Sequence, residues 1–556
     1  MTPRSALRLA APFALAAALA SCARPDAGVL DARYFGSISP PRENVLRFNN
    51  DTEPETLDPG RMSGQPDGRV ALLLFEGLTS PDPQTLEPFP GQAYRWETSA
   101  DGRTVIFHLR PGLAWSDGAP LVAGDFAYAW RRVLDPATAS RAASALYVVA
   151  GAQAFNSGAD ADPAHVGVRA PDDSTLVVTL AGPTAWFVFL TGLPSFMPVP
   201  RHTVARWGDT WTEPGHLVGN GPFVLRRHVL GERIDCARNA RYWDARSVRL
   251  DGVVAYAVDD LNTSANLYKA GELDWNPSGD IPAPFLPYLR GYADYSTGEY
   301  QATYFYSVNA TRPPFDDVRV RRALDLAIDR ESIARDLLKG TRRAWGRIAP
   351  AGYPGYDPPP PVRFDPAAAR ASLAAAGFPG GRGFPRFAIL FNTSEDNRRI
   401  AEAIQAMWRR ELGVPVELEN QEFASYMQTT TNLRYAVARR SWIGDYLDPN
   451  TFLEPLRTGD GNNRTGWSDP LYDSLLRAAA ATVQPARRFA ILREAEGRAL
   501  DAAVFLPIYH YATHELVKPY VRGLHHTALD IHPLTRVWID RQWRQHEPIA
   551  AAGDRP

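Results

Sequence analysis

The chain is organised around the segment Tyr435-Ala-Val-Ala-Arg-Arg-Ser-Trp-Ile-Gly-Asp-Tyr-Leu-Asp-Pro449. Its first half, residues 435–439, is short and rich in β-forming residues, which predicts a buried strand. Gly444 then provides a turn that places Asp445 just beyond the carboxyl end of the strand, where ligands bind in open α/β sheets. A carboxylate there, beside Trp442, is a candidate site for a cationic group of a ligand. The alternative is a loop aspartate that caps the next helix.

Length and composition limit the class of protein. The 556 residues are too many for one hydrophobic core, so two or three domains are expected. The composition is that of a globular protein, with 45% hydrophobic and 22% charged residues. The 60 basic and 62 acidic residues leave a net charge of −2, which gives no electrostatic footprint for nucleic acid and excludes that partner.

The amino terminus has the features of a targeting segment. Arg4 and Arg8 precede an apolar run, Leu9 to Ala20. This run is too short to span a bilayer as a helix, so a signal peptide is predicted. The run ends in Leu19-Ala-Ser-Cys22, which resembles a bacterial lipobox. Residues 1–22 are therefore predicted to be a lipoprotein signal peptide with lipidation at Cys22. Ordinary secretory cleavage is the alternative.

The segment that follows, residues 23–43, is predicted to be a tether because Ala, Arg, Pro, Asp and Gly dominate it. The other cysteine is Cys236, so no intramolecular disulfide can form once Cys22 is acylated, and metal sites built on cysteine clusters are excluded. No cofactor and no metal are expected. His525-His526 suggests a metal pair, but adjacent residues point to different sides of a strand, so a pair in a surface loop is expected.

Residues 384–442 predict an α/β unit. A strand over residues 387–391 precedes a helix that carries apolar residues on one face and ends at Gly413, and alternating valine and leucine residues then predict a second strand over 414–418. The alternation of strands and helices predicts α/β lobes.

The run Ala100-Asp-Gly-Arg-Thr-Val-Ile-Phe-His-Leu-Arg-Pro-Gly-Leu-Ala-Trp-Ser-Asp-Gly-Ala-Pro120 resembles the signature of the family 5 extracellular solute-binding proteins, the peptide receptors of ABC importers. The joint order of further matches, which cover roughly the whole mature chain, is more specific than any single motif. These matches are Glu55-Thr-Leu-Asp-Pro59, Phe75-Glu-Gly-Leu78, Asn220-Gly-Pro-Phe223, Tyr242-Trp243, Gly271-Glu-Leu-Asp274, Asn309, Pro314-Phe-Asp-Asp-Val-Arg-Val-Arg-Arg-Ala-Leu324, Asn392-Thr-Ser394, Trp442-Ile-Gly-Asp-Tyr-Leu-Asp-Pro449, Pro507-Ile-Tyr-His-Tyr511 and Val517-Lys-Pro519.

The resemblance implies an α/β fold like that of the periplasmic binding proteins, with two α/β lobes that close on a ligand about a hinge and an additional third domain. On this pattern the domains are lobe I (residues 44–75, 201–300 and 513–545), the extra domain (76–200) and lobe II (301–512). The resemblance also implies that an ammonium group of a peptide binds the aspartate of the Trp-x-x-Asp segment, which here is Asp445. The backbone of Ser441, Trp442, Ile443 and Gly444 is then expected to pair with the main chain of the ligand.

Other positions of the family's site carry over with departures. The retained or matching residues are Arg439, Asn392, Tyr509 and Tyr511, whereas the substituted positions are Ser63 and Gln65 in the early loop, Phe423, Thr430 and Asn397. Because fewer groups are left to hold a ligand carboxylate, a standard free tri- or tetrapeptide is not favoured. A murein-derived, amidated or longer peptide is compatible with these substitutions.

Several alternatives stay open. The same fold binds nickel chelates, haem or oligosaccharides in relatives, and a surface lipoprotein active in adhesion or signalling is a third hypothesis. A peptide hydrolase is a distant alternative, since the chain has no Gly-x-Ser-x-Gly elbow, no Walker loop and no His-Glu-x-x-His motif. The favoured prediction is a monomeric, lipid-anchored receptor, not an enzyme, that delivers a peptide to the permease of an ABC importer in the inner membrane.

Overall fold

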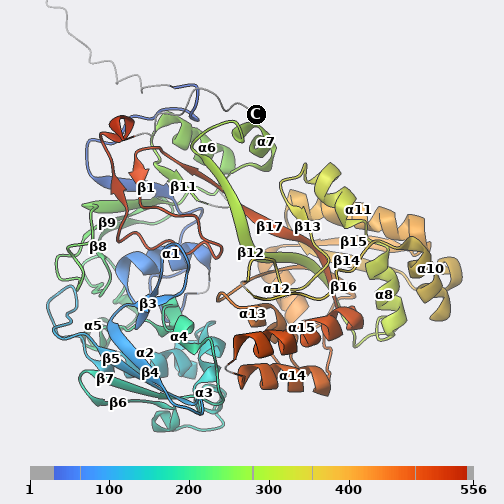
Figure 1. The fold of residues 1–556 in the computed structure, drawn as a ribbon, viewed down its shortest axis with the longest axis horizontal. Coiled ribbons are helices and arrows are strands. Elements are labelled where there is room, and N and C mark those ends of the chain that lie inside the picture. Colours follow the sequence, from blue (N-terminus) through green and yellow to red (C-terminus); the bar gives the residue numbers. More distant parts are fainter. Residues whose placement is uncertain (1–30, 63, 278–280, 354, 483, 547–556) are drawn as a thin grey trace, which may run out of the picture.

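The computed structural model describes residues 31–62, 64–277, 281–353, 355–482 and 484–546 (Figure 1). The predicted signal peptide with Cys22, the first part of the predicted tether, and Ser63 lie outside these residues. Within the described chain no helix is both long and apolar enough to cross a membrane.

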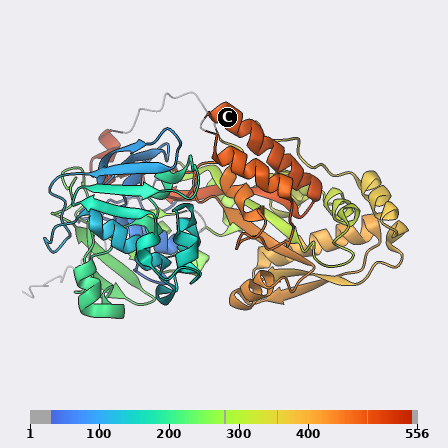
Figure 2. The same cartoon turned by 90° about the horizontal axis from the view of Figure 1, so that it is seen from below.

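One mixed sheet runs through two halves of the molecule that lie side by side (Figure 2). Its order is β15-β14-β16-β12-β17-β11-β1-β10-β9-β8, and β13 pairs with β17. The strands are β1 (Val45–Asn49), β8 (Phe223–Val229), β9 (Arg233–Arg238), β10 (Gly252–Tyr256), β11 (Trp275–Asn276), β12 (Tyr295–Val308), β13 (Arg343–Ala344), β14 (Phe387–Asn392), β15 (Val416–Gln421), β16 (Val437–Ile443) and β17 (Phe505–Val517).

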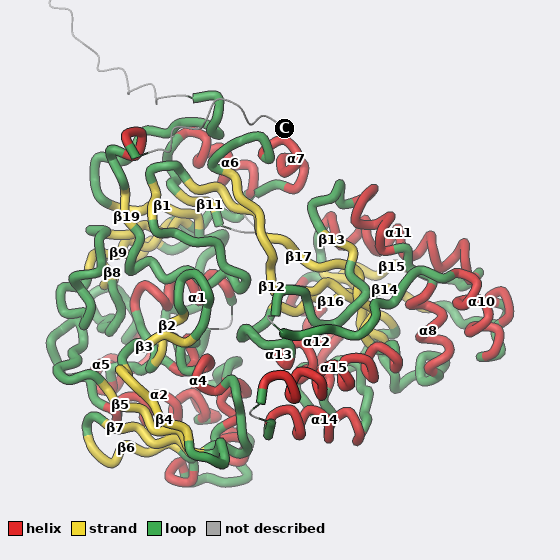
Figure 3. The backbone as a smooth tube through the Cα atoms, viewed as in Figure 1, coloured by secondary structure: helices red, strands yellow, loops and turns green. Residues whose placement is uncertain are grey.

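Two long strands connect the halves. β12 has 14 residues and β17 has 13, and they pair antiparallel and pass from one half to the other (Figure 3). The predicted domain boundaries at 300/301 and 512/513 fall inside these two strands. Continuous β-structure therefore links the halves. We call the half with β1 and β8–β11 lobe I and the half with β14–β16 lobe II.

Lobe II has helices on both faces of its sheet. Tyr304 and Tyr306 of β12 pack with α8 (Val318–Leu326), α10 (Pro366–Ala375) and α11 (Glu395–Leu412). Phe305, which points to the other face, packs with α13 (Asn450–Leu453), α14 (Pro470–Ala480) and α15 (Pro485–Ala502). The unit predicted over 384–442 is confirmed: β14, α11 and β15 follow one another, and α11 ends at Gly413 in the left-handed conformation.

A second sheet lies below lobe I in Figure 1, with the order β4 (Ala93–Thr98), β5 (Thr104–Leu109), β7 (Thr175–Thr179) and β6 (Val168–Asp172). Phe126 and Trp130 of α2 (Ala123–Leu134) are completely buried in the hydrophobic core that this sheet shares with lobe I. Shorter elements complete this half: α1 (Gln65–Leu74), β2 (Thr79–Pro81), β3 (Pro88–Pro90), α3 (Ala152–Asn156), α4 (Phe187–Leu190), α5 (Arg201–Trp207), α6 (Leu261–Ala270), α7 (Leu286–Leu289), β18 (Val521–Arg522) and β19 (Trp538–Ile539).

Three of the family-like motifs meet at one buried carboxylate. Glu76 accepts hydrogen bonds from Tyr242 Oη (2.5 Å), Trp243 Nε1 (2.6 Å) and Gln92 Nε2 (2.6 Å), and its carbonyl oxygen accepts one from Asn220 Nδ2 (2.8 Å). Burial raises the pKa of Glu76 to about 7. These motifs therefore hold the extra sheet onto lobe I and are structural.

Two local predictions are corrected. Residues 31–43 were assigned to the tether, but Tyr34, Phe35 and Ile38 are buried, and the amide of Phe35 donates to Asp294 (2.9 Å) in lobe I. These apolar residues have no regular spacing, so the sequence pattern did not reveal that they pack. The strand predicted at 435–439 lies at 437–443, because residues up to Ile443 pair with β12.

Candidate functional site

One edge of β16 is largely free. On one side all seven residues of β16 pair with Ala302–Val308 of β12, whereas on the other side β14 pairs only with Val437 and Ala438. The hydroxyl of Tyr426 donates to the carbonyl of Arg439, and no described strand pairs with this side from residue 440 to 443. An unpaired strand edge of this kind can pair with an extended chain.

Asp445 follows directly at the carboxyl end of this edge. Its amide donates to Thr451 Oγ1 (2.9 Å), and the Thr451 hydroxyl reaches its carboxylate at 3.5 Å. Asp445 is exposed, yet burial raises its pKa to about 6, with a smaller contribution from Asp460. The carboxylate forms no ion pair with any described cation.

Asp448, three residues later, differs from Asp445 because its carboxylate has an arginine partner. Both Nη atoms of Arg488 bind its carboxylate, one of them at 2.9 Å, and its Oδ1 accepts from the amide of Asn450 (2.9 Å). Arg488 neutralises this carboxylate, which also accepts from the first amide of α13. The alternative that Asp445 caps the next helix is wrong, because its carboxylate accepts only from the Thr451 side chain among the described residues.

The retained Arg439 lies in a polar network on the α11 face of lobe II. Its Nη1 donates to Asn392 Oδ1 and its Nη2 to Tyr511 Oη, both at 3.2 Å, and its guanidinium lies 4.6 Å from the ring centre of Tyr304. Asn397 Nδ2 donates to the carbonyl of Asn392 (3.1 Å). Arg439 has no carboxylate partner in the described chain.

The other predicted site residues lie at different depths. Tyr509 is buried and stacks on Tyr304, with 4.6 Å between the two ring centres. Trp442 packs against the hydrophobic core that lies beneath α13–α15. Gln65, at the start of α1 in lobe I, donates to Tyr300 Oη of β12. Phe423 begins α12 (Phe423–Thr431), but its side chain is outside the described part of the chain, as is Ser63.

Lobe II touches the extra domain across the site. The ring of Tyr446 stacks on that of Trp186 at 5.4 Å with an interplanar angle of 6°. Nearby, a cavity of about 100 Å³ lies between α1, β2 and the segment 529–531, and Leu72, Phe189, Leu193 and Leu529 line it. Leu529 also lies against Gly444, so the cavity borders the turn that carries Asp445.

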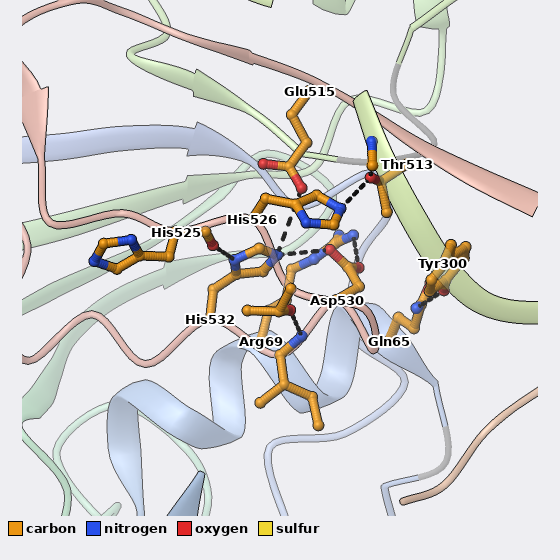
Figure 4. A network of polar contacts seen from close by, with 12 residues as sticks. Gln65, Arg69, Tyr300, Thr513, Glu515, His525, His526, Asp530 and His532 are labelled. Carbon is orange, nitrogen blue, oxygen red and sulfur yellow. Dashed lines mark hydrogen bonds and ion pairs between the residues drawn. The ribbon is translucent and has the colours of Figure 1, made fainter. Parts of the chain in front are cut away.

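A buried charge cluster, the hinge cluster, lies beside β17 and consists of Arg69, Glu515, Asp530 and His532 (Figure 4). Arg69 Nη2 lies 2.6 Å from Asp530 Oδ2, and His532 Nε2 lies 2.9 Å from Asp530 Oδ1 and 4.0 Å from Glu515 Oε1. His532 Nδ1 lies 3.1 Å from the carbonyl oxygen of His525 and must donate to it.

The hinge cluster contains the group of described residues that could hold a metal ion, since ligand atoms of Glu515, Asp530 and His532 lie within 4.8 Å of one another. However, Arg69 already neutralises Asp530. Although burial opposes the charged ring, the Asp530 hydrogen bond and the Glu515 charge raise the pKa of His532. Arg69 and His532 are therefore the cations that face Asp530, whereas burial raises the pKa of Glu515 to about 7. We assign the cluster a structural role.

The cluster was not predictable from the sequence pattern, because its members come from residues 69, 515, 530 and 532. His525-His526 lie in a loop, as predicted, but one of the two side chains turns inward. His526 is half-buried and contacts Thr513 of β17, and burial lowers its pKa. The segment turns back onto the sheet here, which the adjacent histidines alone could not indicate.

Comparison with known proteins identifies the family. Residues 87–464 match the model of the bacterial extracellular solute-binding proteins, family 5. The chain belongs to this family. A probable deoxycholate-binding periplasmic protein of Escherichia coli K12 is 37% identical, with 86% of this chain and 90% of the relative covered. A periplasmic oligopeptide-binding protein of Salmonella typhimurium is 34% identical, with 89% and 92% covered.

Solved structures of family 5 proteins have the same architecture. The crystal structure of an oligopeptide-binding protein of Haemophilus influenzae in complex with the peptide RPPGFSPFR matches with a TM-score of 0.79 and 31% identity, over 90% of this chain and all of that one. The predicted fold class, two α/β lobes of the periplasmic-binding type, is thereby confirmed.

Proposed function

We propose that this family 5 protein is the extracytoplasmic receptor of an ABC importer and binds oligopeptides in the cleft between its lobes. The observation that carries the proposal is the juxtaposition of Asp445, a carboxylate without an ion-pair partner, with the free edge of β16. An extended peptide can pair its main chain with residues 440–443 and place its ammonium group at Asp445.

The energetics favour an ammonium ligand. Burial has raised the pKa of Asp445 to about 6, so its charged form is destabilised until a cation arrives. A ligand ammonium stabilises the charged form of Asp445 for every peptide, whatever its side chains.

The same proposal includes the parts of the chain beyond the described residues. Cys22 would carry a lipid that anchors a monomeric receptor to a membrane facing the periplasm, and the closed lobes would present the peptide to permease subunits. The contact of Tyr446 with Trp186 across the cleft supports a closing motion between the halves.

A second candidate is an amphipathic anion of the bile-acid class, as the name of the Escherichia coli relative suggests. The apolar lining of the cavity beside Leu529 favours it. Such a ligand has no ammonium group, so it would leave Asp445 unpaired.

Calorimetry with the purified mature protein decides between the two. We expect peptides of five or more residues with a free amino terminus to bind, and N-acetylated versions of the same peptides to bind at least tenfold more weakly. Binding of deoxycholate together with no response to any peptide would overturn the proposal in favour of the second candidate.

A further inference from the structure

Two arginines in lobe II, Arg440 and Arg464, have no carboxylate within ion-pair distance among the described residues. Arg440 Nη1 donates to the carbonyl oxygen of Asn462 (3.1 Å) and the guanidinium lies 5.8 Å from the ring centre of Phe305. Arg464 has two nitrogens, Nε and Nη1, that are sealed from solvent without a hydrogen-bond partner. Neither side chain forms an ion pair with a carboxylate anywhere in the described ranges.

The two cations are neighbours although 24 positions separate them. Burial first, and then the charges of Arg464 and Arg439, lower the pKa of Arg440, and burial likewise lowers the pKa of Arg464. Two tyrosines border both guanidinium groups: Tyr426 from α12, and Tyr435, whose hydroxyl donates to the carbonyl of Arg464. Asp460 is the acid that acts on Arg464, but it stays beyond ion-pair distance.

Two desolvated cations without a nearby anion are unfavourable inside a folded protein, because burial removes the water that stabilises each charge. Buried charges are therefore usually paired or bind a ligand. The planar guanidinium fork, moreover, matches the two oxygens of a carboxylate. The missing partner of Arg440 and Arg464 is therefore an anion that arrives with the ligand.

The position of the pair along β16 fits such a ligand. Residue 440 precedes residue 445 by five positions, at most about 16 Å of extended chain, and the edge between them is free. An extended peptide spans at most about 3.3–3.6 Å per residue, so four or five residues bridge from Asp445 to Arg440.

We propose that Arg440 and Arg464 form an anion pocket that receives a carboxylate of the bound peptide, separate from Arg439. Successive residues of a strand point to opposite faces, so Arg439 on the α11 face and Arg440 on the Phe305 face cannot serve one carboxylate together. The pocket compensates for the substituted positions Phe423, Thr430 and Asn397. The inference rests on the proposed peptide-binding function and adds a preference for ligands with a carboxylate at this distance.

The test uses the full mature protein and calorimetry with alanine tetra- and pentapeptides. Each peptide is compared with its carboxyl-terminal amide and with versions that contain one Glu or one Gln. The variants are Arg440→Gln and Arg464→Gln, and the matched control is Arg457→Gln, because Arg457 lies in the same loop as Arg464 but is exposed and paired with Glu454 (3.0 Å).

We expect Arg440→Gln and Arg464→Gln to bind the carboxylate-bearing peptides at least tenfold more weakly and their amide or Gln counterparts with unchanged affinity. Sensitivity to amidation identifies the chain terminus as the source of the carboxylate, and sensitivity to Glu against Gln identifies a side chain. The ligand-free variants should unfold at the same or a higher temperature, because each loses an unpaired buried cation.

Equal affinity of the variants and the native protein for all peptides would overturn the anion pocket while leaving peptide binding intact. A uniform loss for charged and uncharged peptides together with a lower unfolding temperature would assign the arginines a structural role and would also overturn it. If the native protein binds no peptide, the proposed function fails, and the pocket fails with it.

Discussion

The cleft and the hinge cluster both contain charged side chains, but only the hinge cluster pairs its charges with one another. In the hinge cluster Arg69, Asp530, His532 and Glu515 balance one another within one network. In the cleft Asp445 has no cation and Arg464 no anion among the described residues, although both lie in lobe II. Charges that the fold needs for itself are paired inside the fold, whereas the unpaired charges are the ones that we propose to contact the two ends of a ligand.

The largest effect on stability is expected when a paired charge of the hinge cluster is removed. Arg69→Met leaves the buried carboxylate of Asp530 with only His532, and breaking a buried ion pair from one side costs about 3–5 kcal/mol. We expect the free energy of unfolding to fall by that amount in urea titrations. Arg95→Met, which removes an exposed pair with Glu97, should change it by about 0.2–1 kcal/mol at most. Equal effects of the two variants would contradict a stabilising role for the hinge cluster.

Removal of the unpaired charge of Asp445 should weaken ligand binding but should not lower stability. Asp445→Asn is expected to weaken peptide binding at least tenfold, about 1.4 kcal/mol, because the ligand ammonium loses its partner. Stability without ligand should be unchanged or higher, since a desolvated carboxylate is lost. Calorimetry and urea titration measure the two quantities, and an unchanged affinity would refute the role of Asp445.

The affinity for peptide should depend on pH through the titration of Asp445. The pKa of Asp445 is raised to about 6 in the free protein, so below pH 6 the carboxylate is protonated and must release a proton before an ammonium can bind. Affinity should therefore be about tenfold lower at pH 5 than at pH 7 because of Asp445, and it should fall separately above about pH 8, where the α-amino group of the ligand loses its proton. Asp445→Asn should remove the difference between pH 5 and pH 7. A difference that persists in the variant would indicate another titrating group.

The smallest expected effect concerns closure. Tyr446 and Trp186 form a stacked pair across the cleft, and such pairs contribute about 0.5–1.5 kcal/mol. Trp186→Ala should lower peptide affinity by about two- to tenfold and shift the radius of gyration measured by X-ray scattering toward larger values. Phe89→Ala, an exposed aromatic of β3, is the control. If scattering is identical with and without Trp186, the stacking does not stabilise the closed arrangement.

Local chemistry made much of lobe II predictable. The turn at Gly413, the alternation in β15 and the apolar face of α11 are all encoded within a few residues of the element that they define. Asp445 was also predictable, because a Gly turn after a strand projects its carboxylate at the sheet edge. The extent of β16 was not, since pairing with β12, more than 130 residues earlier, decides where that strand ends.

The sequence by itself determined the family, the α/β class and the candidate ammonium site, because motif order and hydrophobic periodicity are local properties of the chain. Only the tertiary structure decided which charges have partners. Asp445 and Asp448 are three residues apart and chemically identical, yet Arg488 reaches one and no described cation reaches the other. Arg440 and Arg464 form a pocket for the same reason: a charge interacts with what folding brings near it, and proximity in space is absent from the linear order of residues.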